Sequence, residues 1–359
     1  MFEIALLGLL AAAVALVGWN RVLSSSSPPP SPSSSLSSPK LAWAPPPCGN
    51  DGFPCQDITL KNTGAHQVPA LEPNVDYRIH LPASGPLDGG ITIDSGHNVQ
   101  IIGGQIDLTY PCSEDADNCM GIYIAKHSPG EMFVEGVWIH NPVTMPAHCP
   151  TAATRTSQPC STGDAIDVNT ANYLGVNPIT ITLENIRADG IAGGSGFSDH
   201  SDILQPYQAP LDTIRIDRFT GTSNDQGFTI NPDLALKNFG DVVTYDIRDT
   251  NLVDIHNPYT GFRNRYLWWL IDASTCHSGQ IALSNVYTSE ADGTLRLDSA
   301  WPDTNQPAAC MSKWSGSALS FHGIPVTGSI TEGVPPGGDF VPVGVAGIHY
   351  RSPGYQGGG

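Results

Sequence analysis

Polar side chains recur at one spacing in three neighbouring stretches of the sequence. The stretches are GDAID at 163–167, SDILQ at 201–205 and DQGFT at 225–229. In each stretch a carboxylate or amide is followed three positions later by another polar side chain. Crowded carboxylates can divide the work of an acid and a base, because like-charge repulsion raises the pKa of one of them. Such chemistry requires the three stretches to lie side by side, so the elements that carry them decide the prediction.

A short strand pattern recurs along the chain from about residue 90. Apolar residues alternate with other residues and are followed by a turn residue, which is typical of a β-strand that ends in a turn. The clearest copies are ITLENI at 181–186, IRIDRF at 214–219, IRDTNL at 247–252 and IALSNV at 281–286. A second short strand is expected before each copy, with candidates GITID at 90–94, GIYIA at 121–125, DAIDV at 164–168, DILQP at 202–206, QGFTI at 226–230, YLWWL at 266–270 and TLRLD at 294–298.

Two strands that recur at a nearly fixed period form a unit that cannot bury its apolar face alone and must stack on its neighbours. The sequence therefore predicts an all-β fold, a right-handed single-stranded parallel β-helix of about six to seven coils with disulfide-closed loops. A β-propeller is the alternative, but its blades need four strands within about 40–45 residues.

Stacking in register would place Asp164 beside Asp202 and Asp167 beside Gln205. The three-residue spacing would turn one side chain inward in a regular strand, so all three coils should share a local irregularity. As an alternative, Asp residues at strand ends are ordinary turn residues of a β-helix.

Further residues extend this polar column into a candidate binding face. Carboxylates, amides, arginines and aromatic rings along one face suit a sugar polymer, because rings stack on sugars and polar groups bind hydroxyls. The candidate catalytic residues are Asp164, Asp202 and Asp167, and the candidate substrate-binding residues are His200, Gln205, Asp225, Gln226, Arg263, Arg265, Trp268 and Tyr123. Strand alternation requires either Trp268 or its neighbour Trp269 to point into the core.

The coils resemble the pectin-lyase-like superfamily of right-handed parallel β-helices, which includes polygalacturonase-type glycoside hydrolases and pectate lyases. TGDAID at 162–167 is similar to the NTDGID motif of the polygalacturonases, which implies a catalytic carboxylate at Asp164 with Asp167 beside it. Asp202 falls near the family's Asp-Asp pair, which here reads DHSD. The family's Gly-His-Gly is replaced by NDQGF, and its Arg-x-Lys is approximated by Arg263 and Arg265. The resemblance covers about residues 85–300.

The resemblance leaves two enzymatic chemistries open. A hydrolase uses one protonated carboxylic acid and one carboxylate, without a cofactor. A lyase would hold calcium on two or three of the aspartates and use an arginine as the base. We expect hydrolysis of an extracellular polysaccharide first and lyase action second. A carbohydrate-binding or structural β-helix without catalysis is the third alternative.

Composition sets the compartment and the partners. A formal net charge of −18 excludes nucleic acid as a favoured partner. Eight cysteines with short spacings predict disulfides and an oxidising compartment, extracellular or periplasmic. The expected pairs are Cys48 with Cys55, Cys112 with Cys119, Cys149 with Cys160, and Cys276 with Cys310.

The chain is expected to contain four regions. Its N-terminal apolar run predicts a signal anchor or signal peptide, the only segment expected to contact a membrane. The regions are the signal segment at 1–23, a Ser/Pro-rich linker at 24–45, a β-helix domain with an N-terminal cap at 46–322 and a Gly/Pro-rich tail at 323–359. The oligomeric state stays open.

Overall fold

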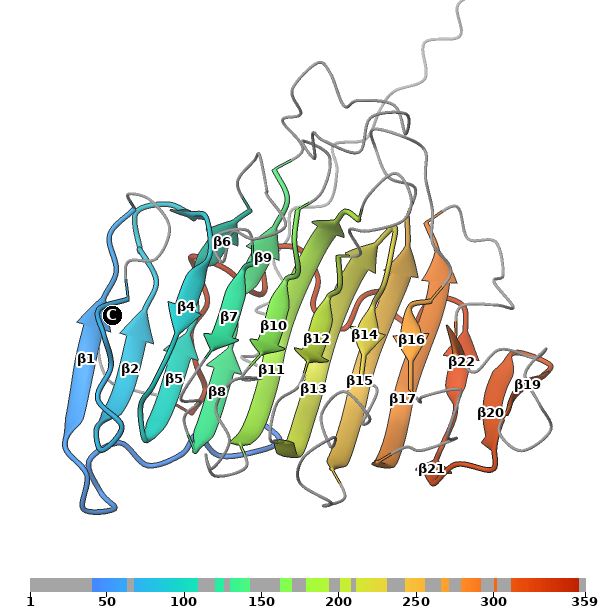
Figure 1. Ribbon diagram of the computed structural model, residues 1–359. Helices are drawn as coiled ribbons and strands as arrows, with labels where there is room; N and C mark the ends of the chain where they lie inside the picture. Colours follow the sequence, from blue (N-terminus) through green and yellow to red (C-terminus); the bar gives the residue numbers. More distant parts are fainter. Residues whose placement is uncertain are drawn as a thin grey trace, which may run out of the picture. The chain divides into compact units, whose positions relative to one another are not determined.

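The regular elements of the computed structural model are β-strands in two sheets (Figure 1). This bears out the all-β prediction for the part of the chain that the structure describes. The described residues are 41–62, 68–108, 120–125, 130–142, 162–169, 179–193, 201–207, 211–230, 243–255, 266–270, 279–291, 300–301 and 311–354.

The larger sheet has 15 strands, and its main path runs β1-β2-β5-β8-β11-β13-β15-β17-β22-β20-β19. Neighbours on this path are parallel, except that β20 is antiparallel to both β19 and β22. The strands are β1 (Cys55–Thr59), β2 (Asp76–His80), β3 (Leu87–Asp88), β5 (Asn98–Ile102), β6 (Gln105–Asp107), β8 (Glu131–Glu135), β9 (Trp138–His140), β11 (Ile179–Ile191), β13 (Leu211–Ser223), β15 (Thr244–Asp254), β17 (Gln280–Glu290), β19 (Met311–Ser315), β20 (Ala318–His322), β21 (Val326–Thr327) and β22 (Ile330–Glu332).

The smaller sheet has seven strands, all parallel, and lies in front of the larger one in Figure 1. From β4 to β18 the chain alternates between the two sheets, so each coil contributes one short strand and one long or bent strand. This is the arrangement of a parallel β-helix. The strands are β4 (Ile91–Ile93), β7 (Ile122–Ala125), β10 (Ile166–Asn169), β12 (Leu204–Tyr207), β14 (Phe228–Thr229), β16 (Trp268–Trp269) and β18 (Ala300–Trp301).

The core lies between the sheets and consists of apolar columns. Ile166 pairs with Leu204, Leu204 with Phe228 and Phe228 with Trp268, and all four side chains are fully buried. Aromatic edges fill the later coils, since the Phe228 ring lies 5.3 Å from that of Trp268. Stacking buries the apolar half of every short strand. Each large apolar side chain that is buried stabilises the fold by about 1.5–3 kcal/mol.

The long strands bend at one residue per coil, and those residues also form a column. Asn185, Arg218, Asp249 and Asn285 have φ of 57°, 56°, 42° and 58°. Asn and Asp tolerate this left-handed conformation better than other non-glycine residues, which explains the turn residue in the repeat. Arg218 departs from the pattern, and its Nε donates to Asn185 Oδ1 at 2.9 Å.

Two parts of the repeat differ from the sequence prediction. Ile247 pairs with Ile216 and Leu283, so the copy predicted as IRDTNL at 247–252 is YDIRDT at 245–250, two residues earlier. The reason is that Asp249 takes the left-handed position instead of Asn251. The seventh short strand is β18, and the candidate TLRLD at 294–298 lies outside the described residues.

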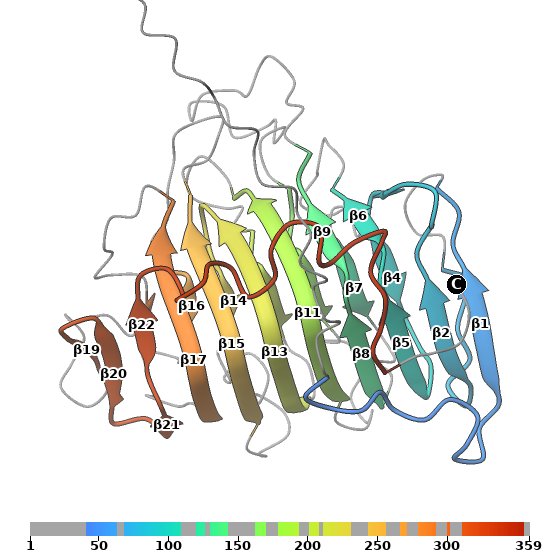
Figure 2. The ribbon, with the colours of Figure 1, turned by 180° about the vertical axis from the view of Figure 1, so that it is seen from behind.

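Residues on both sides of the expected domain pack against the larger sheet (Figure 2). The backbone amides of Ala42 and Trp43 donate to the Glu184 carboxylate at 3.1 and 2.7 Å, so the packed chain begins before residue 46. Beyond β22, the segment 333–354 crosses the outer face of the sheet as an irregular strap, and Arg187 Nη1 donates to Asp339 Oδ2 at 2.8 Å. The domain therefore extends into the expected tail.

Cys48 and Cys55 form a disulfide, as predicted, which is typical of an oxidising, extracellular-type compartment. The other three expected pairs stay predictions, because their cysteines lie outside the described residues. These cysteines are Cys112, Cys119, Cys149, Cys160, Cys276 and Cys310. The expected signal segment at 1–23 also lies outside them. Within the described ranges, no helix has the length and apolar character to cross a membrane.

Candidate functional site

The three polar stretches stack in the predicted register on the smaller sheet. Asp167 pairs with Gln205, which sets Asp164 beside Asp202 one coil away. The pairing of Leu204 with Phe228 continues both columns into the next coil. Asp164 and Asp202 are in contact, because the Asp202 backbone amide donates to Asp164 Oδ1 at 2.6 Å.

A shared bend explains the three-residue spacing. Asp164 and Asp202 each precede the first residue of their strand by two positions, so strand alternation does not apply to them. The backbone amide of Ala165 donates to the Asp202 carbonyl at 2.8 Å, and that of Ile203 to the Gly227 carbonyl at 2.9 Å. The same bend thus repeats in successive coils and turns both members of each polar pair outward.

Burial and charge raise the pKa of Asp164. Its exposed fraction is 4%, so desolvation penalises the carboxylate form most strongly. The carboxyl groups of Asp202, Asp167 and Asp225 raise its pKa further by like-charge repulsion. The hydrogen bond from the Asp202 amide acts in the opposite direction and is outweighed. The pKa of Asp164 is therefore well above that of an ordinary aspartate.

Asp202 is a hydrogen-bond acceptor on both carboxyl oxygens. Gln205 Nε2 donates to Oδ2 at 2.9 Å, and the Thr229 hydroxyl donates to Oδ1. Thr229 Oγ1 is also 2.9 Å from Gln226 Oε1. Because a hydroxyl has one hydrogen, this second contact requires the Gln226 amide group to turn and present its NH₂. Both carboxyl oxygens of Asp202 thus accept hydrogen bonds, and its side chain is fully buried.

Asp225 closes the cluster from the adjoining loop. Its Oδ2 accepts a hydrogen bond from the Ser201 backbone amide at 3.3 Å. It also packs against Gly193, where an added Cβ would lie 1.8 Å from Asp225 Oδ2. Only glycine permits this close approach, so Gly193 belongs to the cluster although the sequence analysis did not identify it.

An outward column runs past the cluster along the smaller sheet. It contains Tyr123, Asp167, Gln205 and Thr229, and it ends in the described part at the β16 and β18 strands. The predicted role of Trp268 in substrate binding is wrong, because this indole is fully buried in the core. Trp269 holds the outward position instead, and its half-buried ring lies 5.9 Å from that of Tyr266.

Three predicted binding residues, His200, Arg263 and Arg265, lie outside the described residues. Asp164, Asp167, Asp202, Gln205, Asp225, Gln226 and Tyr123 are gathered on the smaller sheet or its adjoining loop. The sequence thus identified most of the cluster. It missed Gly193 and Trp269.

Comparison with known proteins adds no family. No protein-family model matches the chain, and neither curated proteins nor solved structures give a match. The cluster must therefore be interpreted from its own chemistry.

Proposed function

We propose that this protein is a glycoside hydrolase that cleaves an extracellular polysaccharide. The observation that carries the proposal is the contact between Asp164 and Asp202, with a raised pKa on Asp164. Hydrolysis of a glycosidic bond needs a carboxylic acid that is still protonated and a carboxylate nearby. Four buried aspartates lie together here, and carboxyl groups with strongly perturbed pKa values concentrate at functional sites.

In this proposal Asp164 is the general acid. Desolvation and the charges of Asp202, Asp167 and Asp225 keep its proton in place until the glycosidic oxygen can accept it. Asp202 is the carboxylate that acts as base or nucleophile, because its contacts with Gln205 and Thr229 favour an acceptor. The partly exposed Gln205 side chain covers Asp202, so a bound sugar must displace this amide to reach the carboxylate.

The outward column supplies the sugar-binding surface. Tyr123 and Trp269 are half-buried rings on either side of the acidic cluster, separated along the sheet by Asp167, Gln205 and Thr229. Successive coils are about 4.8 Å apart, which matches the advance of a polysaccharide by one sugar ring. The resemblance to the pectin-lyase-like superfamily supports the same substrate class, and so does the Cys48–Cys55 disulfide, which is typical of an extracellular-type compartment.

The direct test is incubation of the full chain with a panel of plant, fungal and bacterial glycans. The proposal predicts new reducing ends without an unsaturated uronate, and loss of this activity in Asp164→Asn. The matched control is Asp94→Asn, an aspartate that follows β4 in the same sheet and should keep full activity. Unsaturated products would establish a lyase, and binding without cleavage would establish a binding protein. Either outcome would overturn the proposal.

A further inference from the structure

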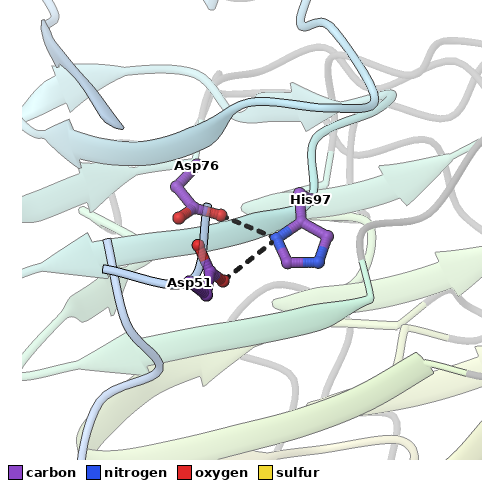
Figure 3. Close-up of side chains that lie close together, drawn as sticks. All are labelled: Asp51, Asp76 and His97. Carbon is purple, nitrogen blue, oxygen red and sulfur yellow. Dashed lines mark hydrogen bonds and ion pairs between the residues drawn. The ribbon is translucent and has the colours of Figure 1, made fainter. Parts of the chain in front are cut away.

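We propose that Asp51, Asp76 and His97 form a divalent-cation site at the N-terminal end of the β-helix, with Zn²⁺ as the ion (Figure 3). The three residues come from separate segments. Asp51 lies in the loop closed by Cys48 and Cys55, Asp76 opens β2, and His97 precedes β5. The site is independent of the acidic cluster and of the function proposed for it.

The three donor atoms have the geometry of a metal site. All three lie within 4.8 Å of one another. His97 Nδ1 is 2.8 Å from Asp76 Oδ1 and 3.5 Å from Asp51 Oδ2, and Figure 3 shows both carboxylates directed at this nitrogen. Zinc bonds of about 2.0–2.2 Å in tetrahedral geometry separate neighbouring donors by about 3.3–3.6 Å. Small side-chain movements would therefore admit the ion between them.

Outer hydrogen bonds hold both carboxylates in place. Asp76 accepts from the backbone amides of Gly49 and Asn98, at 3.0 and 3.2 Å. Asp51 accepts from Asn98 Nδ2 and from the Phe53 backbone amide, each at 3.2 Å. Partners of this kind orient metal-binding carboxylates and are a regular part of such sites. The disulfide adds rigidity, because it closes the loop that carries Asp51.

Charge also favours a cation here. Two carboxylates face one imidazole nitrogen, which can donate a single hydrogen. In the described part of the chain, His97 is the basic side chain that pairs with Asp51 and Asp76. With a neutral imidazole, the carboxylates of Asp51 and Asp76 would bring two negative charges close together, and Asp76 is fully buried. A divalent ion compensates both charges and accepts the imidazole nitrogen as a ligand.

The donor set selects the ion. Calcium and magnesium prefer oxygen ligands, and calcium takes six to eight of them. One imidazole nitrogen with two carboxylate oxygens suits Zn²⁺, which commonly binds three protein ligands and one water. The side chains of His97 and Asp51 are 32% and 24% exposed, so solvent can supply the fourth ligand. The ion would tie the disulfide loop to the first coils, next to the edge strand β1.

The test is calorimetric titration of the metal-stripped, oxidised full-length chain with ZnCl₂. We expect one Zn²⁺ per chain and a higher unfolding temperature in its presence, whereas CaCl₂ at the same concentration gives neither. Asp51→Asn and His97→Gln should weaken binding at least as much as loss of an outer partner does, about 10–100-fold. Asp51→Asn is the safer variant, since Asp51 lies on an exposed loop and the amide keeps its shape.

The matched control is His80→Gln. His80 Nε2 is 2.8 Å from Asp57 Oδ1 on the neighbouring strand, a His–Asp pair with one carboxylate in place of two. This variant should bind Zn²⁺ as the wild type does. No Zn²⁺ binding by the wild type, or equal binding by the wild type, Asp51→Asn and His97→Gln, would overturn the proposal. Calcium binding as tight as zinc binding would overturn the choice of ion.

Discussion

The outer faces of the two sheets both bury carboxylates, but they compensate them differently. On the larger sheet, the N-terminal segment and the C-terminal strap bring hydrogen-bond donors to Glu184 and Glu135. Trp43 and Ala42 donate to Glu184, and the Tyr350 hydroxyl donates to Glu135 at 2.6 Å. On the smaller sheet, Asp164 faces other carboxyl groups.

This difference separates structural acids from candidate catalytic ones. A carboxylate that accepts hydrogen bonds from the chain's own terminal segments fixes those segments and has little capacity left for a ligand. A carboxyl group surrounded by other carboxyl groups stores unfavourable electrostatic energy instead, and such strain is common at functional sites. The comparison therefore indicates a packing role for the Glu135 and Glu184 face, and it agrees with the catalytic role proposed for the Asp164 face.

The largest expected effect is on activity at the smaller sheet. Asp164→Asn should lower the turnover of a cleaved glycan by about 10²–10⁴-fold, the usual contribution of a general acid. The amide still accepts the Asp202 N–H and removes the like-charge repulsion, so the variant should be at least as stable as the wild type. Steady-state kinetics and urea unfolding of the same sample check both halves. Full activity in this variant would remove the distinction between the two faces.

The tryptophan pair gives the next largest effect. Trp268→Ala should destabilise the fold by about 3–5 kcal/mol, because it removes a fully buried ring. Trp269→Ala should cost much less stability and should weaken substrate binding, since this ring is outward and half-buried. Urea unfolding and KM measurements on both variants separate the roles. Equal losses of stability would show that both rings belong to the core.

Stability should depend on pH through Glu184 on the larger sheet. Burial raises its pKa from 4.5 to about 7, and the amides of Trp43 and Ala42 offset part of this rise. The unfolded chain loses this proton at lower pH than the folded chain. Protonated Glu184 therefore contributes its full stabilisation of the fold below about pH 4.5. As the pH rises towards 7, the free energy of unfolding falls by about 1–3 kcal/mol. Glu184→Gln should remove that part of the slope in urea unfolding between pH 4 and 8. An unchanged slope would contradict the assignment.

The smallest effect concerns the strap. Tyr350→Phe removes the hydrogen bonds to Glu135 and Asn185, of 2.6 and 3.1 Å, and should cost about 1–2 kcal/mol. Glycan cleavage should not change, because the strap lies on the other sheet. The control Tyr287→Phe alters a half-buried tyrosine of β17 and should have a smaller effect. A loss of activity in Tyr350→Phe would show that the strap on the larger sheet affects the cluster on the smaller sheet, which contradicts the separation of the two faces.

The coil pattern and the polar column could be predicted because both are periodic. Strands that cannot bury themselves must stack, and the spacing that Asp164 and Asp167 share with Asp202 and Gln205 fixes how they align. The pattern could not choose between Asp249 and Asn251 for the left-handed residue, because Asp and Asn both tolerate that conformation. Strand alternation predicted that one of the two adjacent tryptophans points inward but not which one. The contact of Trp268 with Phe228 in the core decides this.

Contacts between distant segments had no local signal. Asp51, Asp76 and His97 meet only because the disulfide loop and the first coils pack together. Nothing in the composition of the tail predicted the contacts of Asp339 with Arg187 or of Tyr350 with Glu135.

The most direct test of the central claim is the titration of Asp164 itself. Carbon-13 NMR of the protein with labelled aspartate carboxyl groups can assign the Asp164 signal by its loss in Asp164→Asn. The account predicts that Asp164 stays protonated well above pH 3.8, and that Asp202→Asn lowers its pKa by removing the largest like-charge repulsion. An Asp164 that titrates near 3.8 in the wild type, unaffected by Asp202→Asn, would contradict the account.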